Sequence, residues 1–172
     1  MKVLFYPAIS LDGFIAKLDG DSNWVKEEDE QIFADEVRRA GCVIVGRKTF
    51  EQYQNIYPIA DTTTFVCTSS SARTTDGANT QVKYVGGAVK TVLEQIQAAG
   101  FSTAVLSGGA ETNGRFAEAL CIDEILVSIY PHFLGCGLPM FGNRKIQLRL
   151  ELLHTRQLGD GVIQNRYEVS RS

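Results

Sequence analysis

The sequence predicts an α/β fold: a mixed, mostly parallel sheet with helices on both faces and an antiparallel hairpin at the C-terminal end. Two observations carry this prediction. Up to about residue 120, short and nearly continuous apolar runs alternate with amphipathic segments, as in buried parallel strands connected by helices. Beyond that point apolar and polar residues alternate one by one, which is typical of half-exposed antiparallel strands. This order favours a mixed sheet over a barrel or a helix bundle.

The first part of the chain supplies strands and helices in turn. Residues 3–9 form a short apolar run like that of a strand covered on both faces, and residues 14–16 resume this character after a turn. Residues 27–40 predict a helix, because acidic residues crowd its first turn, two arginines occupy its last turn and a glycine follows. Residues 42–45 then predict a buried parallel strand, and residues 46–49 a turn into a short helix.

The middle of the chain repeats this alternation. Residues 62–67 are rich in β-branched side chains and predict a third strand, and residues 82–85 form a further short one. The apolar spacing of residues 89–96 predicts an amphipathic helix. Residues 103–106 predict another strand, followed by a helix from about residue 110 to 120.

Three segments of the tail alternate between apolar and polar side chains and predict antiparallel strands: residues 125–129, 145–152 and 162–169. The apolar stripe of the second segment consists of Ile146, Leu148, Leu150 and Leu152. We see no repeat, linker or low-complexity tract in the sequence, so residues 1–172 are expected to form a single domain.

Composition and charge disfavour several classes of protein. The 172 residues are 44% apolar and 22% charged, with a formal net charge of -3, as in an ordinary globular protein. We expect no nucleic-acid partner, because phosphate backbones call for a basic surface. The N-terminus lacks the apolar region of a signal peptide, and no apolar run reaches the ~20 residues that span a bilayer. A cytoplasmic protein without a membrane partner is expected.

The cysteines and histidines do not predict a metal site. The four cysteines form no C-x-x-C pair, and only His132 and His154 could supply imidazole ligands. Both histidines are expected to have packing or surface roles. Cys42 and Cys67 lie in apolar runs and are expected to be small buried side chains.

Two segments that follow predicted strands carry groups suited to phosphate. Gly46-Arg47-Lys48-Thr49 combines a flexible turn, two cations and a hydroxyl at a helix start, where free N–H groups favour an anion. The alternative is a glycine turn with solvated charges. Residues 68–73 offer Thr68, Ser69, Ser70 and an arginine that could hold a phosphomonoester, although a serine-rich segment can also be an ordinary loop.

A third junction is rich in glycine, and one helix start is rich in carboxylates. Ser107-Gly108-Gly109-Ala110 lies between a buried strand and a helix, where adjacent glycines permit close backbone approach to a ligand. It is not the G-x-G-x-x-G fingerprint, and a simple tight turn is the alternative. Residues 27–30 are all acidic, which is usual for a solvated helix start, but one of them could face a pocket and supply a proton.

Four segments in order carry a resemblance to a known superfamily. They are residues 8–16 (AISLDGFIA), 46–51 (GRKTFE), 107–109 (SGG) and 123–142, which includes PHFLGCGLPMFG. Together they resemble the superfamily of dihydrofolate reductase and the reductase domain of riboflavin biosynthesis, and the last segment looks more like the riboflavin-type reductase. The chain is therefore similar to a stand-alone, divergent member, and the resemblance implies a dihydrofolate-reductase-like fold.

The resemblance also implies an NADPH site. Ala8 and Ile15 would flank the nicotinamide, and Gly108 and Gly109, joined by a cis peptide, would give the close backbone approach. Arg47 would lie near the pyrophosphate and the adenosine 2′-phosphate. The remaining implied cofactor residues are Gly46, Lys48 and Thr49 at the pyrophosphate, Thr68, Ser69 and Ser70 on the adenosine side, and Ala110, Glu111 and Thr112 beneath the phosphates.

The function that follows is hydride transfer from NADPH to a C=N-type bond in a small heterocyclic or ribosylamino-pyrimidine substrate. The resemblance implies an enzyme similar to 5-amino-6-(5-phosphoribosylamino)uracil reductase, with dihydrofolate reductase and a non-catalytic nucleotide-binding protein as alternatives. Dihydrofolate reductase uses a carboxylate from its first long helix, for which Glu30 is slightly preferred here over Asp29. No metal is expected.

The sequence further predicts a homodimer. The apolar stripe of residues 146–152 and the apolar residues of the loop 133–141 would expose more hydrophobic surface than a monomer usually does. Two-fold pairing would cover it on both chains, as in the riboflavin-type relatives that the sequence resembles. The alternative is that both segments pack within one subunit.

Overall fold

The computed structural model describes residues 1–68 and 81–170. The longer strands are β1 (Lys2–Phe5), β4 (Cys42–Gly46), β5 (Thr63–Thr68), β6 (Val82–Gly86), β7 (Thr103–Gly108), β8 (Glu124–Tyr130), β10 (Arg149–Gln157) and β11 (Ile163–Ser170). The short strands are β2 (Ala8–Ser10), β3 (Phe14–Ala16) and β9 (Leu138–Pro139). The helices are α1 (Glu27–Ala40), α2 (Arg47–Gln52), α3 (Val89–Ala98), α4 (Ala110–Glu118) and a 3-10 turn, η1 (Gly159–Gly161).

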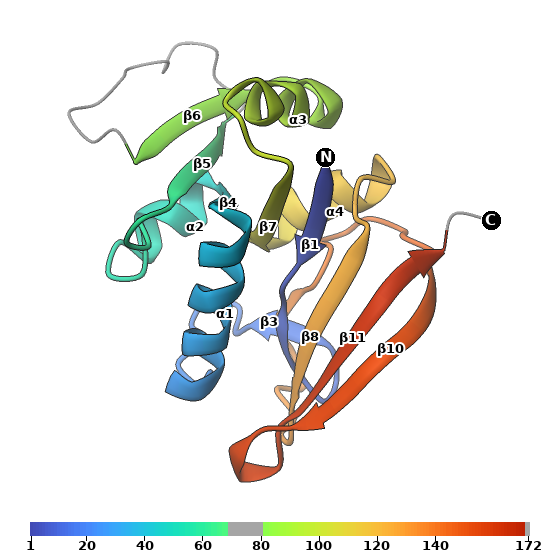
Figure 1. The fold of residues 1–172 in the computed structure, drawn as a ribbon. Coiled ribbons are helices and arrows are strands. Elements are labelled where there is room, and N and C mark those ends of the chain that lie inside the picture. Colours follow the sequence, from blue (N-terminus) through green and yellow to red (C-terminus); the bar gives the residue numbers. More distant parts are fainter. Residues whose placement is uncertain (69–80, 171–172) are drawn as a thin grey trace.

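The main sheet has the order β10-β11-β8-β1-β7-β4-β5-β6, with β2 beside β8 (Figure 1). All pairings from β8 through β6 are parallel, whereas β11 runs antiparallel to β8 and β10 antiparallel to β11. Strands β3 and β9 form a separate two-stranded sheet. The predicted fold class, including its C-terminal hairpin, is confirmed.

The helices cover both faces of the sheet. Val37 of α1 packs with Leu4 and Val43 in one buried cluster, which also receives side chains from α2. Ile96 of α3 and Phe116 of α4 belong to a second cluster on the opposite face. Alternate side chains of each parallel strand enter opposite clusters, which explains why these strands are apolar almost without interruption.

Three expectations need correction. Residues 125–129 lie in β8, which is antiparallel to β11 as expected but is buried nearly throughout rather than half-exposed, since its alternate side chains enter the two clusters. The run 3–9 is two strands, because Tyr6 and Pro7 separate β1 from β2. The hairpin strand β10 begins at Arg149 rather than at residue 145, and Ile146 and Leu148 pack instead against the main core.

The expectations for Cys42, Cys67 and His132 agree with the structure. Cys42 and Cys67 are buried thiols, and burial raises their pKa, to about 12 for Cys42 and about 11 for Cys67. His132 packs edge-on against Trp24 with ring centroids 4.9 Å apart. Within residues 1–68 and 81–170 no helix is long and apolar enough to cross a membrane.

Candidate active site

A cavity of about 350 Å³ lies beyond the carboxyl ends of β1 and β7 and beside α1 and α2. Ligands of open α/β sheets bind at this edge of the sheet. Its wall combines segments that are far apart in the sequence. The wall residues relevant to chemistry are Tyr6, Ala8, Ile15, Asp29, Glu30, Phe33, Thr49, Tyr57, Ser107, Gly109, Ala110 and Asn113.

The segments that follow β4 and β7 approach each other closely, and we call residues 46–49 and 108–112 together the glycine cradle. A Cβ added at Gly46 would collide with Oγ1 of Thr112, and one at Gly109 would stand 2.7 Å from Oγ1 of Thr49. Gly108 has a φ of 124°, which only glycine adopts readily. The peptide between Gly108 and Gly109 is cis, as the resemblance implies. Glycine is therefore required at position 108 by its backbone conformation, and at positions 46 and 109 by the threonine side chains that face them.

Only some of the cofactor-binding residues that the resemblance implies line the cavity. Ala8, Ile15, Thr49, Gly109 and Ala110 line it, from the two sides on which the resemblance puts them. The other described cofactor candidates lie outside its wall: Gly46, Arg47, Lys48, Thr68, Gly108, Glu111 and Thr112. Ser69 and Ser70 lie outside the described residues.

Two of the charged candidates are paired within the protein. The guanidinium of Arg47 donates to Oε1 of Glu51 at 2.9 Å, one turn along α2, and both side chains are exposed. Glu111 accepts two hydrogen bonds from Arg144, at 2.7 and 2.8 Å, and this ion pair lowers the pKa of Glu111. Glu111 therefore holds Arg144, which lies in the segment that leads to β10. The ion pair of Arg47 with Glu51 is exposed, so a ligand phosphate can replace Glu51.

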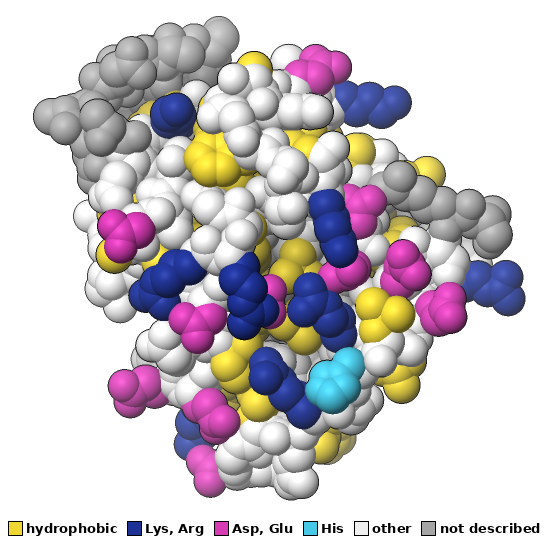
Figure 2. All heavy atoms as spheres, viewed as in Figure 1, with side chains coloured by type: hydrophobic (Ala, Val, Ile, Leu, Met, Phe, Trp, Pro, Cys, Tyr) yellow, Lys and Arg dark blue, Asp and Glu magenta, His cyan; other side chains and the backbone are white. Residues whose placement is uncertain are grey.

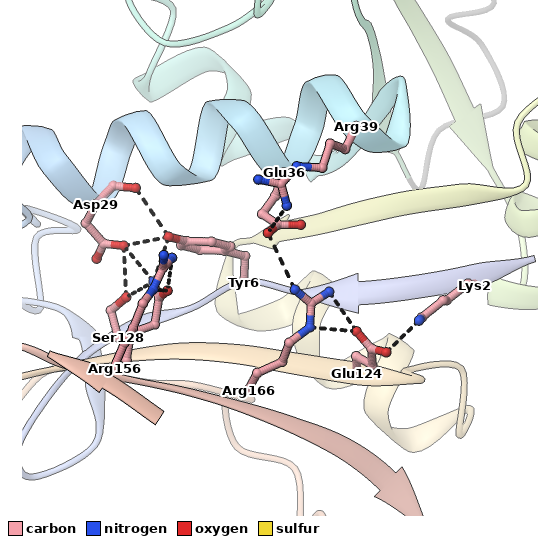
Figure 3. A network of polar contacts seen from close by, with 10 residues as sticks. Lys2, Tyr6, Asp29, Glu36, Arg39, Glu124, Ser128, Arg156 and Arg166 are labelled. Carbon is pink, nitrogen blue, oxygen red and sulfur yellow. Dashed lines mark hydrogen bonds and ion pairs between the residues drawn. The ribbon is translucent and has the colours of Figure 1, made fainter. Parts of the chain in front are cut away.

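The Asp29 carboxylate is the centre of a buried network (Figure 3). The residue is 1% exposed because it shares the buried face of α1 with Phe33 and Val37, at a spacing of four residues. Its Oδ1 accepts hydrogen bonds from the Tyr6 hydroxyl at 2.6 Å and the Ser128 hydroxyl at 2.8 Å. Gln164 of β11 joins the network as well, so strands β8 and β11 and the connection between β1 and β2 all contribute to a network centred on the first turn of α1.

The proton positions in this network are fixed by groups that can only donate. Arg156 donates to Oε1 of Gln164 at 2.8 Å, so the Gln164 amide must turn its Nε2 toward the network. That nitrogen donates to the hydroxyls of Tyr6 and Ser128, and both hydroxyls donate hydrogen bonds to Asp29. Burial raises the pKa of Tyr6, and the charge of Asp29 raises it further. The hydroxyls remain donors, and Asp29 is held as a hydrogen-bond acceptor.

The second oxygen of Asp29 is less occupied. Among residues 1–68 and 81–170, Oδ2 accepts one hydrogen bond, from the Tyr130 hydroxyl at 3.0 Å, and that hydroxyl accepts in turn from the backbone N–H of Lys26. Glu30, one residue further along α1, lines the same cavity but is exposed. The two candidate carboxylates therefore differ in setting: Asp29 is fixed in the wall, and Glu30 lies at a position open to solvent.

Sequence reasoning missed several polar residues of the cavity. Tyr57 and Ser107 are hydrogen-bonded to each other through their hydroxyls, and burial raises the pKa of Tyr57 to about 12. Asn113 is 1% exposed in the first turns of α4. A polar side chain on the buried face of a predicted helix is a signal that could have identified Asn113 and favoured Asp29 over Glu30. Tyr6 and Tyr57 occur in apolar surroundings and carry no comparable signal.

The RibD C-terminal domain family matches residues 1–164 of the chain. Two proteins of Bacillus subtilis (strain 168) are similar over nearly their full length. The uncharacterized protein YwjB is 30% identical over 167 residues, which cover 94% of both chains. The uncharacterized protein YyaP is 26% identical over 176 residues, which cover 96% of this chain and 94% of its own.

Solved structures share the fold at lower identity. A protein assigned to riboflavin biosynthesis from Shewanella sp. PV-4 has a TM-score of 0.84 at 24% identity and covers 99% of this chain and 100% of its own. The diaminohydroxyphosphoribosylaminopyrimidine deaminase/5-amino-6-(5-phosphoribosylamino)uracil reductase of Thermotoga maritima has a TM-score of 0.78 at 15% identity, covering 98% of this chain and 56% of its own. Dihydrofolate reductase from Enterococcus faecalis, complexed with NADP(H), has a TM-score of 0.71 at 19% identity, covering 98% and 96%.

Proposed function

Because the chain belongs to the RibD C-terminal domain family, we propose that it is an NADPH-dependent reductase. The reaction would reduce a C=N-type bond in a small heterocyclic or ribosylamino-pyrimidine substrate, as 5-amino-6-(5-phosphoribosylamino)uracil reductase does. The observation that supports this most directly is the cavity itself. It joins one side of the glycine cradle to the Asp29 carboxylate, so a cofactor and a substrate can meet within one cavity.

The residues of the cavity fit a dinucleotide. The glycine cradle has no Cβ atom at Gly46, Gly108 or Gly109, so backbone N–H groups there can approach a pyrophosphate. Ala8 and Ile15 offer small and apolar contacts of the kind that a nicotinamide ring needs. Arg47 supplies an exposed cation at the same edge of the sheet for a 2′-phosphate. NADPH would supply the hydride; the protein must orient the substrate, exclude water and deliver a proton.

We assign the orienting role to Asp29 rather than to Glu30. Three side-chain hydroxyls and one amide hold Asp29 in place, and Oδ2 retains acceptor capacity because it has a single hydrogen bond. A carboxylate fixed in this way can accept N–H groups of a pyrimidine-like substrate. Glu30 has no such support from the described residues, and its exposure allows exchange of protons with solvent. It is retained as the alternative proton donor.

Substitution of the two carboxylates separates these roles. Asp29→Asn should lower kcat/KM by roughly 10²-fold or more, the usual scale for a group that acts on the substrate, while leaving NADPH affinity little changed. Glu30→Gln is the matched control on the neighbouring position and should have a smaller effect. Unfolding curves for both variants show whether the asparagine disturbs the buried network. If Glu30→Gln is the more damaging change, the assignment of Asp29 is wrong.

The substrate is identified by a panel assay. NADPH oxidation should be followed with 5-amino-6-(5-phosphoribosylamino)uracil and with dihydrofolate, and each should be repeated with NADH. We expect turnover of the first substrate or of a close ribosylamino-pyrimidine relative, with NADPH preferred. Turnover of dihydrofolate alone would favour the dihydrofolate reductase alternative. NADPH binding without turnover of either substrate would favour a non-catalytic nucleotide-binding protein.

A further inference from the structure

The charged side chains in the wall of the cavity are acidic. Among the residues that the structure describes, they are Asp29 and Glu30, which lie next to each other in the first turn of α1. The other polar side chains of this wall carry hydroxyl or amide groups. Because charges interact strongly where protein displaces water, a ligand beside α1 meets a negative potential.

The lysines next to this wall are paired with carboxylates. Lys17 precedes and Lys26 follows the segment 20–25, several residues of which line the cavity. Nζ of Lys17 lies 2.6 Å from Asp21, and Nζ of Lys26 lies 3.1 Å from Asp160. Helix α1 adds the positive end of its dipole, but its first turn carries four acidic residues. The lysines and the helix end are thus matched by acidic groups, which leaves the charge of the wall negative.

The hydroxyls of Ser22 and Tyr53 offer acceptors to a ligand, and both residues line the cavity. The Tyr53 hydroxyl donates its single proton to the carbonyl of Gly20 at 2.8 Å. The Ser22 hydroxyl lies 2.9 Å from the Tyr53 hydroxyl and must therefore donate to it. Both oxygens can then only accept from a further group, as can the carboxylate of Asp29. A ligand that binds these groups must bring hydroxyl or N–H donors.

We propose that the substrate of this cavity is an unphosphorylated ribosylamino-pyrimidine, rich in hydroxyl and N–H donors, rather than a phosphate ester. The inference rests on the proposed function, because it names the substrate of that reaction. A phosphate monoester carries a charge between -1.5 and -2 near pH 7. The carboxylates of the wall repel it, and its ionised oxygens cannot donate to Ser22 or Tyr53. The hydroxyls of a free ribosyl group can donate to the same oxygens.

Two ligands that differ only in the phosphate test this inference by binding alone. They are 5-amino-6-(ribosylamino)uracil and 5-amino-6-(5-phosphoribosylamino)uracil, titrated calorimetrically into the protein saturated with NADP⁺, so that no hydride is transferred. The wild-type protein should bind the unphosphorylated compound more tightly, on the order of ten-fold at low ionic strength. Added salt should reduce this preference, because it screens the repulsion between phosphate and carboxylates. Tighter binding of the phosphorylated compound overturns the inference and leaves the proposed function standing.

Reversal of one charge in the wall is the second arm of the test. Glu30→Lys should abolish or reverse the preference, because it replaces a repelling group by an attracting one. Glu27→Lys is the matched control: Glu27 is exposed in the same turn of α1 but lies outside the wall of this cavity. Thermal unfolding verifies that both variants are folded. Equal effects of the two substitutions would contradict the inference, as would binding of NADPH with affinity for neither pyrimidine. If the wild-type protein does not bind NADPH, the proposed function itself is wrong.

Discussion

Arg47 is the residue on which cofactor choice should depend. Its guanidinium is exposed and shared with Glu51, so a 2′-phosphate can compete for it. Arg47→Ala should weaken NADPH binding by about 1–3 kcal/mol, the range for hydrogen bonds to charged groups, and should change NADH binding little. Glu51→Gln is the matched control: it frees the guanidinium and should maintain or strengthen the preference for NADPH. Isothermal titration with both cofactors measures these effects, and equal affinity of the wild-type protein for NADPH and NADH would contradict the prediction.

Substitution of Gly109 by alanine tests the glycine cradle by adding one methyl group. In Gly109→Ala the new Cβ would stand 2.7 Å from Oγ1 of Thr49, so the Thr49 side chain or the segment that carries it must shift. We expect loss of NADPH binding in a protein that remains folded, as judged by circular dichroism and thermal unfolding. Thr49→Ala in the same chain removes the collision and should recover part of the binding relative to Gly109→Ala. Normal NADPH affinity in a folded Gly109→Ala variant would identify this junction as an ordinary turn.

At the scale of secondary-structure elements, an ion-pair network connects the C-terminal hairpin to the rest of the sheet and to α1 (Figure 3). Arg166 of β11 donates to Oε2 of Glu124 on β8 at 2.8 Å and lies 3.5 Å from Oε1 of Glu36 on α1. Lys2 of β1 binds the other oxygen of Glu124. The Glu124 side chain is 11% exposed, so loss of its partners leaves a carboxylate that water reaches poorly.

We therefore expect Arg166→Met to lower the free energy of unfolding by about 1–3 kcal/mol. Arg38→Met is the matched control, because Arg38 pairs with Asp35 on the exposed side of α1 and such pairs contribute about 0.5 kcal/mol or less. Urea unfolding of the three proteins at neutral pH measures both differences. Equal stability of the two variants would show that the network contributes no more than a surface pair.

The same network predicts a dependence on pH. Burial raises the pKa of Glu124, but the hydrogen bonds from Lys2 and Arg166 outweigh this effect and hold the pKa below its usual value. A lowered pKa in the folded state means that the contribution is complete above the unfolded pKa of about 4.3 and is lost as pH falls through the folded value. The stability difference between wild type and Arg166→Met should shrink on acidification below about pH 4. A difference that is constant with pH would contradict this explanation.

For the molecule as a whole, we propose a homodimer that covers the edge strand β10. All nine residues of β10 are exposed, including Leu150 and Leu152, and hydrophobic side chains are visible over the hairpin (Figure 2). Behind the hairpin lies an apolar hollow of about 280 Å³ that includes Ile146 and Leu148. An open apolar edge strand invites pairing with a second chain.

Light scattering at micromolar concentration tests the homodimer. We expect a mass of twice 18.9 kDa for the wild-type chain, and a mass near 18.9 kDa would contradict the proposal. Leu152→Glu should shift the protein toward monomer, because it would bury a charge in the interface. Leu120→Glu changes a leucine outside β10 that is slightly more exposed, at 66% against 56% for Leu152, and should leave the mass unchanged.

Interactions between residues close together in the sequence, and the pattern of apolar residues, determined much of the fold. Helix α1 begins and ends where its acidic first turn, its basic last turn and Gly41 predict, because these signals act within a few residues of one another. The parallel strands β4, β5 and β7 are recognisable because burial on both faces makes them continuously apolar. The glycines of the cradle are also visible in the sequence, although their purpose is not.

Tertiary structure decided what depends on contacts across the chain. Asp29 and Glu30 are adjacent carboxylates of the same helix, and only the packing of α1 against Tyr6 and Ser128 buries the first and leaves the second exposed. The burial of β8 follows from the packing of its alternate side chains in the two clusters, which local alternation does not reveal. The carbonyl of Met140 likewise fixes the orientation of the Asn113 amide, whose Oδ1 has no hydrogen-bond partner among the described residues. Sequence patterns indicate which secondary structure each segment prefers. The hydrogen-bond partners of Asp29 and Asn113 lie on segments more than twenty residues away along the chain, so only the tertiary structure determines them.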